Sequence, residues 1–356
     1  VLAQGNTKSS VRLSNGLQVD LRVVDEGQFG SAMQYFTGSK AHNVKIRGLA
    51  RKLGLKVNEY GVFKGKKKIA GKTEEEVYSA LGLPWFEPEL REDRGEIEAV
   101  QIGRSNRGKL PNLVKLKDIK GEIHVHTEWS DGEGTIEEVA LQAKAAGCEY
   151  VAHTDHSVTE RIANGLSIER MWKKIEAIDA LNKKRIGIEV FKAAEVDILL
   201  DGNLDYPDDL LDALDIVVAS IHSGFKQTPD KMTGRINDAL NHPRVHVLAH
   251  PTGRLLNSRE SYEVDLDYVM ATAAENGVAL EINGSYQRLD LSDVHARRAL
   301  ELGAIFCLST DAHRLTAVGR FELAVATARR AWIKKSDVLN TKPLLPFKAW
   351  LAQRRG

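Results

Sequence analysis

Nine residues of the types that bind metals recur through the last two thirds of the chain. They are His124, His126, Asp131, His156, Glu195, His222, His250, Asp311 and His313. Histidine nitrogens and carboxylate oxygens are ligands that zinc, manganese and iron accept in proteins. Burying six histidines and three carboxylates together would be costly without cations between them. The pattern therefore predicts an enzyme that holds several metal ions.

Seven short apolar runs rich in β-branched residues predict the strands that position these ligands. The runs are residues 121–127, 149–153, 187–196, 215–221, 245–249, 278–283 and 304–309. Helical patterns fall between and after them, at residues 135–147, 167–183, 229–240, 265–276, 292–302 and 317–334. Strands that alternate with helices indicate a parallel sheet, and seven such units favour a closed barrel over an open sheet. We therefore expect an α/β fold built on a seven-stranded β/α barrel.

The ligands fall at or just beyond the ends of these strands. His124 and His126 lie two residues apart on the first strand, so both side chains project from the same face. Asp131 follows in the next loop, and the remaining ligands end or follow later strands. The C-terminal rim of the strands is where barrel enzymes build their sites. We therefore expect one site rather than nine scattered residues.

Composition places few other limits on the chain. Its 356 residues, 42% hydrophobic and 28% charged, are enough for two or more domains. No apolar run reaches 18 residues and the N-terminus lacks signal-peptide features, so we expect a soluble, cytoplasmic protein that does not contact a membrane. Cys148 and Cys307 lie in apolar elements and are predicted to be buried thiols rather than a disulfide.

The net charge of +1 conceals an uneven distribution. Residues 1–120 hold 22 Lys and Arg against 14 Asp and Glu, whereas residues 121–356 hold 28 against 35. A basic half suits a polyanion such as nucleic acid, and an acidic half suits bound cations. An ordinary difference in charge between two domains is the alternative explanation.

The order of the ligand motifs resembles the polymerase and histidinol phosphatase (PHP) domain over residues 121–345. The motifs are H-x-H-x4-D, TDH, an isolated Glu, SIHS, AHP and STDAH. The resemblance implies a distorted barrel with three divalent metals, manganese and/or zinc, with iron possible. It also implies a grouping: His124, His126, Glu195 and Asp311 on the first metal; Glu195 bridging to a second with His222 and His250; and Asp131, His156 and His313 on the third.

The first 120 residues resemble part of a bacterial or archaeal family X DNA polymerase. The segment VRLSNGLQVDLRVV contains a hairpin signal at Asn15-Gly16, and YFTGSKAHNVKIRGLARKLGLKVNEYGVF resembles the end of the palm and the thumb. The resemblance implies a partial palm (1–36), a small α+β thumb-like domain (37–95), a linker (96–120), the PHP barrel (121–345) and a C-terminal tail (346–356).

The polymerase resemblance also assigns possible nucleotide contacts. Asp20 would be the third catalytic carboxylate, and the incoming nucleotide and primer terminus would be lined by Tyr35, Phe36, Thr37, Gly38 and Asn43. The strand with the paired Asp-x-Asp carboxylates is absent, as are the fingers and the 8-kDa-like domain. Because polymerisation needs two metals held by all three carboxylates, we expect no competent polymerase site.

Basic residues in the first half suit contact with DNA phosphates. Lys64, Lys66, Lys67, Lys68 and Lys72 form a basic turn, and Arg47, Arg51 and Lys52 share one predicted helix. A solvated surface is the alternative for such lysine runs. Together with the thumb resemblance, these residues favour DNA as the partner.

The chemistry expected of clustered metals is phosphoester hydrolysis, because cations polarise a phosphoryl oxygen and activate water. The hypothesis is a metal-dependent 3′–5′ exonuclease that acts on single-stranded or gapped DNA primer ends. Glu195, His124 and Asp311 would carry the catalysis, and Arg254 beside His250 would clamp a phosphate or form a salt bridge.

Other functions remain open. An apurinic-site or 3′-end-cleaning nuclease would use the same ligands. So would a small-molecule phosphoesterase of the histidinol phosphatase type, although such an enzyme would not need a DNA-binding domain. The barrel could instead be an inactive structural module of a polymerase, which the complete ligand set disfavours.

Overall fold

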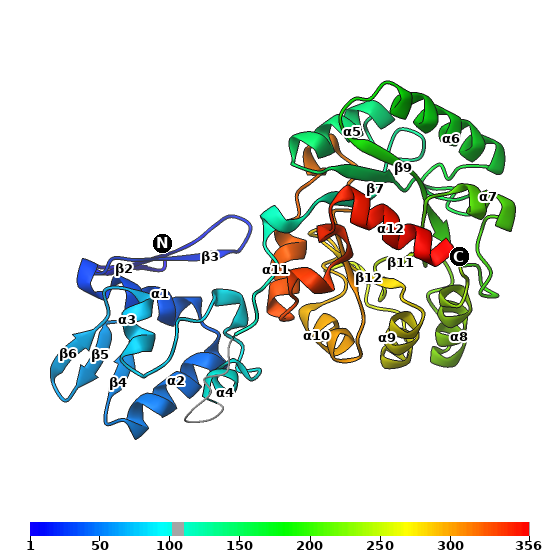
Figure 1. The fold of residues 1–356 in the computed structure, drawn as a ribbon. Coiled ribbons are helices and arrows are strands. Elements are labelled where there is room, and N and C mark those ends of the chain that lie inside the picture. The colour runs from blue at the N-terminus through cyan, green and yellow to red at the C-terminus, as the bar shows by residue number, and fades with distance from the viewer. Residues whose placement is uncertain (102–109, 356) are drawn as a thin grey trace. The chain divides into compact units, whose positions relative to one another are not determined.

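A computed structural model describes residues 1–101 and 110–355. The chain divides into two compact units, Val1–Leu110 and Pro111–Gly356 (Figure 1). The division falls inside the predicted linker 96–120, of which residues 102–109 lie outside the described part. The remaining domain limits stay predictions. In the described part of the chain, no helix combines the length and apolar character needed to cross a membrane.

The second unit is the seven-stranded parallel barrel that the sequence predicts. Its strands are β7 (Gly121–Val125), β8 (Tyr150–His153), β9 (Glu189–Asp197), β10 (Ile216–Ser220), β11 (Val247–Leu248), β12 (Ala279–Asn283) and β13 (Phe306–Ser309). They lie side by side in sequence order. A parallel bridge between Val125 and Ala312 joins the first strand to the chain after the last. The ring is therefore nearly closed.

Helices surround this sheet (Figure 1). They are α5 (Ile136–Ala145), α6 (Ile168–Lys183), α7 (Asp208–Ala213), α8 (Pro229–Leu240), α9 (Leu266–Glu275), α10 (Asp293–Glu301) and α11 (Glu322–Arg330). Thr135 and Glu138 form a reciprocal capping box that starts α5. Helix α7 has only six residues and follows β9 without a predicted counterpart. The predicted helix 317–334 is shorter, because α11 spans only nine residues.

The barrel unit has two apolar layers. One lies between the strands and the helices, and the other groups strand residues such as Ala193 and Val218 with Phe347 and Leu351. The last two belong to α12 (Leu344–Arg355), so this helix is part of the barrel core. The predicted limit between barrel and tail, at 345/346, falls inside α12. Cys148 and Cys307 are buried and unbonded, as expected.

The first unit combines two small antiparallel sheets with helices. One sheet contains β1 (Ala3–Gln4), β2 (Lys8–Arg12) and β3 (Gln18–Arg22), and the other contains β4 (Lys56–Asn58), β5 (Gly61–Lys64) and β6 (Lys67–Ala70). The β2–β3 hairpin confirms the signal at Asn15-Gly16, and Gly16 takes the φ of 87° that its turn requires. The helices are α1 (Phe29–Thr37), α2 (Lys40–Lys52), α3 (Glu74–Ser79) and α4 (Glu96–Gln101).

Helix α4 lies in the predicted linker but contributes to the core of the first unit. Ile97 and Val100 pack with residues of α2 and α3 in one buried cluster. At the start of α4 the buried Glu96 lies 2.7 Å from His42 Nδ1, and His42 Nε2 lies 3.0 Å from the Tyr78 hydroxyl. The first unit therefore has its own core and its own buried polar contacts.

Candidate metal centre

The structure brings the nine predicted ligands together at the C-terminal ends of the barrel strands. His124 and Glu195 lie within β7 and β9. The other seven follow strands: His126 and Asp131 after β7, His156 after β8, His222 after β10, His250 after β11, and Asp311 and His313 after β13. The period-two and strand-end positions read from the sequence thus correspond to one cluster.

Glu195 lies at the middle of this cluster. Its Oε2 is 3.1 Å from His156 Nδ1 and 3.3 Å from His124 Nε2. Its other oxygen, Oε1, is 2.8 Å from His250 Nε2 and 3.4 Å from His222 Nε2. The two carboxylate oxygens therefore face two different sets of histidines, as a bridging ligand would.

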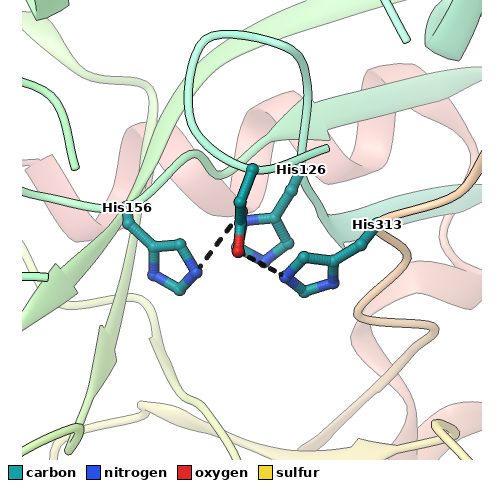
Figure 2. Close-up of side chains that lie close together, drawn as sticks. His126, His156 and His313 are labelled. Atoms are coloured by element: carbon teal, nitrogen blue, oxygen red, sulfur yellow. Dashed lines mark ion pairs between the residues drawn. The ribbon is translucent and has the colours of Figure 1, made fainter. Parts of the chain in front are cut away.

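Asp131 lies near His126, His156 and His313, and Asp311 lies near His126. His126, His156 and His313 converge on one point (Figure 2). Asp131 lies 3.7 Å from both His126 Nδ1 and His156 Nε2, and 3.3 Å from His313 Nε2. Asp311 Oδ1 lies 3.2 Å from His126 Nε2. Because His126 faces both carboxylates, it stands at the border between two ligand groups.

The donor atoms of the cluster fit metal ions. Several are buried and, within the described part of the chain, make no hydrogen bond and have at most ion-pair contacts: His124 Nε2, His126 Nδ1, His156 Nδ1, Glu195 Oε2 and His250 Nδ1. Buried polar atoms are seldom left unpaired, so such a concentration calls for a ligand. Three overlapping groups from the nine residues bring their ligand atoms within 4.8 Å of one another. Nitrogen and oxygen donors at this spacing suit transition-metal cations.

The ionisation of the histidines agrees with this role. Burial, together with the charges of His313 and His156, lowers the pKa of His126 to about 4, so its lone pair is available to a metal. Burial opposes protonation of His222, but Glu195 and Asp197 outweigh it and raise the pKa to about 10. The carboxylates thus favour positive charge beside His222, which a bound cation would supply instead of a proton.

The backbone is strained at two ligands. His250 has a φ of 26° and Asp311 a φ of 51°, in the left-handed region that residues other than glycine seldom adopt. Such conformations persist where surrounding contacts hold them and they concentrate at functional sites. Asp311 N donates to the His124 carbonyl at 3.0 Å, which fixes one of the two.

Buried carboxylates that the sequence did not single out orient the ligands. Glu281 on β12 accepts from His124 Nδ1 at 2.6 Å and from the His250 amide at 2.6 Å. Asp197 lies 2.6 Å from His222 Nδ1. A carboxylate on the second imidazole nitrogen fixes the ring and makes it a stronger metal ligand. Asp197 lies two residues after Glu195 on β9, and this spacing could have revealed it.

Asp155 holds the loop that carries Asp131. It accepts from the Thr127 amide and hydroxyl, both at 2.8 Å, and from Ser130 Oγ at 2.7 Å. Its charge is balanced by the buried Lys174 of α6, whose Nζ lies 2.6 Å away. The TDH motif pointed to His156, but the aspartate beside it proves to have a supporting role.

Two arginines near the cluster have different contacts. Arg254, the predicted phosphate clamp, donates from Nε to the Arg288 carbonyl at 2.9 Å and from Nη2 to the Leu289 carbonyl. These contacts are with the backbone, so phosphate binding by Arg254 stays a prediction. Arg288, which the sequence analysis missed, donates from Nε to Asp311 at 3.1 Å.

The residues predicted to contact DNA lie in the first unit. Asp20 is on the exposed face of β3, where Ser10 and Gln18 donate to it. Asn43 donates to the Tyr35 carbonyl at 2.8 Å, and Gly38 ends α1 with a φ of 75°. These contacts place the residues but leave their predicted DNA roles as predictions.

The predicted basic residues are exposed. Lys64, Lys66, Lys67 and Lys68 lie at the turn between β5 and β6. Arg47 and Arg51 of α2 line a groove of about 400 Å³ together with Lys56 of β4. Exposed cations at a groove are compatible with phosphate binding.

Comparison with known proteins identifies both units. A family model described as PHP domain matches residues 122–285, and one described as DNA polymerase beta thumb matches residues 32–92. The DNA polymerase/3'-5' exonuclease PolX of Bacillus subtilis is 40% identical over 356 residues, which are 99% of this chain and 61% of that relative. The chain therefore spans less than two thirds of the length of PolX.

Shorter relatives match the barrel. A probable phosphatase of Thermoanaerobacter sp. is 32% identical over 234 residues, covering 62% of this chain and 89% of that protein. Among solved structures, a histidinol phosphate phosphatase of Lactococcus lactis covers 60% of this chain and 92% of its own, with 18% identity and a TM-score of 0.43. A likeness that weak adds nothing to the family match.

Proposed function

The chain belongs to the PHP domain family and carries a polymerase-type thumb ahead of that domain, and on this premise we propose a metal-dependent 3′–5′ exonuclease acting on DNA primer ends. The observation that carries the proposal is the cluster of nine ligands, with its unpaired buried donor atoms, in one chain with a thumb domain. The 40% identity to a polymerase/3'-5' exonuclease supports the same reaction.

We assign the ligands to three divalent ions, manganese and/or zinc, with iron a further candidate. The first would be held by His124, His126, Glu195 and Asp311; the second by Glu195, His222 and His250; the third by Asp131, His156 and His313. A bridging role for Glu195 is supported by its two oxygens, of which Oε2 lies near His124 and His156 and Oε1 lies near His222 and His250. Bound ions of this kind activate water and neutralise charge on a phosphodiester.

The chain's own residues would position those ions and the substrate. Glu281 and Asp197 orient His124 and His222, and Asp155 holds the loop of Asp131. Glu195, His124 and Asp311 are the residues on which we expect hydrolysis to depend most. Glu195 and His124 are buried, and their position excludes water from the inner side of the site.

We assign the first unit to DNA binding. The thumb match covers Tyr35, Gly38, Asn43, Arg47 and the lysines of the β5–β6 turn. The exposure of these lysines and the position of Arg47 in the groove support contact with a DNA backbone. Asp20 lies outside the matched residues 32–92, and its role near a primer terminus rests on the polymerase resemblance alone. The domain limits given from the sequence are part of the same proposal.

Degradation of a 5′-labelled primer tests the proposal. The protein is stripped with a chelator, reloaded with Mn²⁺ or Zn²⁺, and incubated with the primer while metal content is measured on the same sample. We expect stepwise shortening from the 3′ end, and its loss in Glu195→Gln and His124→Ala. Glu128→Gln, an exposed carboxylate of the loop that carries Asp131, is the matched control and should retain activity.

The likeness to a probable phosphatase favours one competing function, hydrolysis of a small phosphomonoester. The same preparations should therefore be assayed with a phosphomonoester beside the primer. Hydrolysis of the monoester without shortening of the primer would replace the exonuclease proposal with a phosphatase. Hydrolysis of neither substrate with any metal would leave the barrel as a structural module.

A further inference from the structure

The loop between β12 and α10 (residues 284–292, the β12–α10 loop) is attached at two points to one ligand of the metal cluster. Asn283, at the end of β12, donates from Nδ2 to Asp311 Oδ2 at 3.0 Å. Arg288 donates from Nε to the same oxygen at 3.1 Å. Residues 284–287 therefore form a short arch whose two ends are fixed beside the cluster.

Further contacts hold this arch in place. The Gly284 amide donates to the Ser309 carbonyl at 2.9 Å, and a Cβ at Gly284 would come within 2.9 Å of that same oxygen. The Leu256 amide donates to the Gln287 carbonyl at 2.6 Å. Arg254 binds the next carbonyls of the chain, those of Arg288 and Leu289. The side chains of the arch are thus presented from a fixed backbone, which limits the entropy lost on binding.

Arg288 retains a binding atom beside the cluster. Its side chain is 15% exposed, and its Nη1 is buried without a hydrogen-bond partner among the described residues. A guanidinium with an unused donor next to a metal cluster is suited to a phosphate oxygen.

Tyr286 occupies the middle of the arch and is 73% exposed. Only Ser285 separates it from Gly284, and only Gln287 separates it from Arg288. The Gln287 side chain donates to its hydroxyl at 3.3 Å. An exposed aromatic ring on a backbone held in place can stack with a nucleobase, and such stacking strengthens binding whatever the identity of the base. A planar ring and a cation two residues apart match the base and phosphate of one nucleotide.

We propose that the β12–α10 loop binds the terminal nucleotide of the substrate, with Arg288 holding its phosphate and Tyr286 stacking on its base. Arg254 acts through this loop, as a positioning residue for Arg288. The inference rests on the proposed exonuclease function and specifies how that site recognises an unpaired nucleotide. It assigns a preference for a base-bearing end over a bare sugar-phosphate end.

Two oligonucleotides test the proposal, one ordinary single strand and one of the same length whose 3′-terminal residue lacks its base. We expect Tyr286→Ala to lower kcat/KM for the ordinary strand roughly tenfold or more, mainly through KM, and to leave the abasic strand unchanged. Tyr286→Phe keeps the ring and should behave as wild type. Arg288→Lys should lower kcat/KM on both strands alike, because it acts on phosphate.

Product binding provides a measurement independent of turnover. Thymidine 5′-monophosphate should bind wild type more tightly than deoxyribose 5-phosphate, and Tyr286→Ala should erase that difference. Two results would show that the loop does not recognise the base: Tyr286→Ala hydrolyses the strands and binds the products as wild type does, or its affinity for both products falls equally. Either result would leave the proposed exonuclease function intact. If wild type shortens neither strand and binds the two products equally, both proposals fall.

Discussion

Glu281 is not one of the nine predicted ligands, but it contacts two of them. Its carboxylate is buried and accepts hydrogen bonds from the ring of His124 in β7 and from the backbone amide of His250, which follows β11. Outer carboxylates of this kind typically change metal affinity by roughly 10–100-fold when they are removed. The role of Glu281 is therefore open to measurement without altering any of the nine ligands.

We expect Glu281→Gln to lower metal affinity by roughly 10–100-fold while the fold is retained. An amide can still contact one partner but cannot balance positive charge on His124. Competition with a chromophoric chelator measures the affinity, and circular dichroism checks the fold. Glu128→Gln is the exposed control. Unchanged affinity in Glu281→Gln would contradict the orienting role.

Lys174 provides a second test at the scale of single residues. It is fully buried and neutralises Asp155, which holds the loop of Asp131. Lys174→Met leaves that carboxylate without its cation, and breaking one partner of a buried pair costs about 3–5 kcal/mol. We expect a loss of this size in the free energy of unfolding, measured in urea. A change below about 1 kcal/mol would show that Asp155 is stabilised by its other donors alone.

The sequence identified the nine clustered residues because their types and strand-end positions are local properties. It could not identify Glu281 or Arg288 because their partners lie far along the chain: Glu281 contacts His124, and Arg288 contacts Asp311. The direction in which a long side chain extends cannot be predicted from the local sequence either. Arg254 follows His250 closely in sequence, yet its guanidinium contacts the backbone of residues 288 and 289.

At the scale of elements, repeated patterns were more informative than isolated ones. All seven predicted strands are present. Even β11, which has only two residues, ends at Leu248, two positions before the ligand His250. Elements outside the repeat were harder to place. Helix α7 is too short to show a clear period, and α12 was expected to be partly a tail although its apolar residues enter the barrel core.

Helix α12 should therefore contribute to the stability of the barrel. Phe347 is fully buried and its ring stacks on Tyr150 with centroids 4.4 Å apart. We expect Phe347→Ala to lower the free energy of unfolding by about 3–5 kcal/mol, measured by denaturant titration. Leu345→Ala, on the same helix but 76% exposed, is the control and should change it by less than about 0.5 kcal/mol. Equal effects would mean that α12 does not support the core.

At the scale of the whole molecule, each of the two units has its own buried core among the described residues. In the first unit, burial raises the pKa of Glu96, but donation from His42 and from the backbone outweighs burial and leaves the pKa below its ordinary value of 4.5. Because the pKa of Glu96 is lower in the folded state than in the unfolded state, the carboxylate stabilises the unit above about pH 4.5. This contribution is lost as pH falls through the folded pKa.

Glu96→Gln should therefore destabilise the first unit by about 1–3 kcal/mol at pH 7. The difference from wild type should shrink as pH falls below about 4.5, since the wild-type carboxylate is then protonated. Thermal unfolding followed by calorimetry across this pH range provides the measurement. A difference that stays constant down to pH 3 would contradict the assigned ionisation.

Metal removal should separate the two units in the same experiment. A ligand that binds only the folded barrel stabilises it by RT ln(1 + [L]/Kd), or about 4 kcal/mol at a thousandfold excess over Kd. Chelation should lower the transition of the barrel unit and leave that of the first unit in place, whereas Glu96→Gln should do the reverse. Chelation thereby identifies the unfolding transition of the barrel unit, and Glu96→Gln identifies that of the first unit. If chelation moved both transitions together, the two cores would be coupled in folding, and the division into independent units would be wrong.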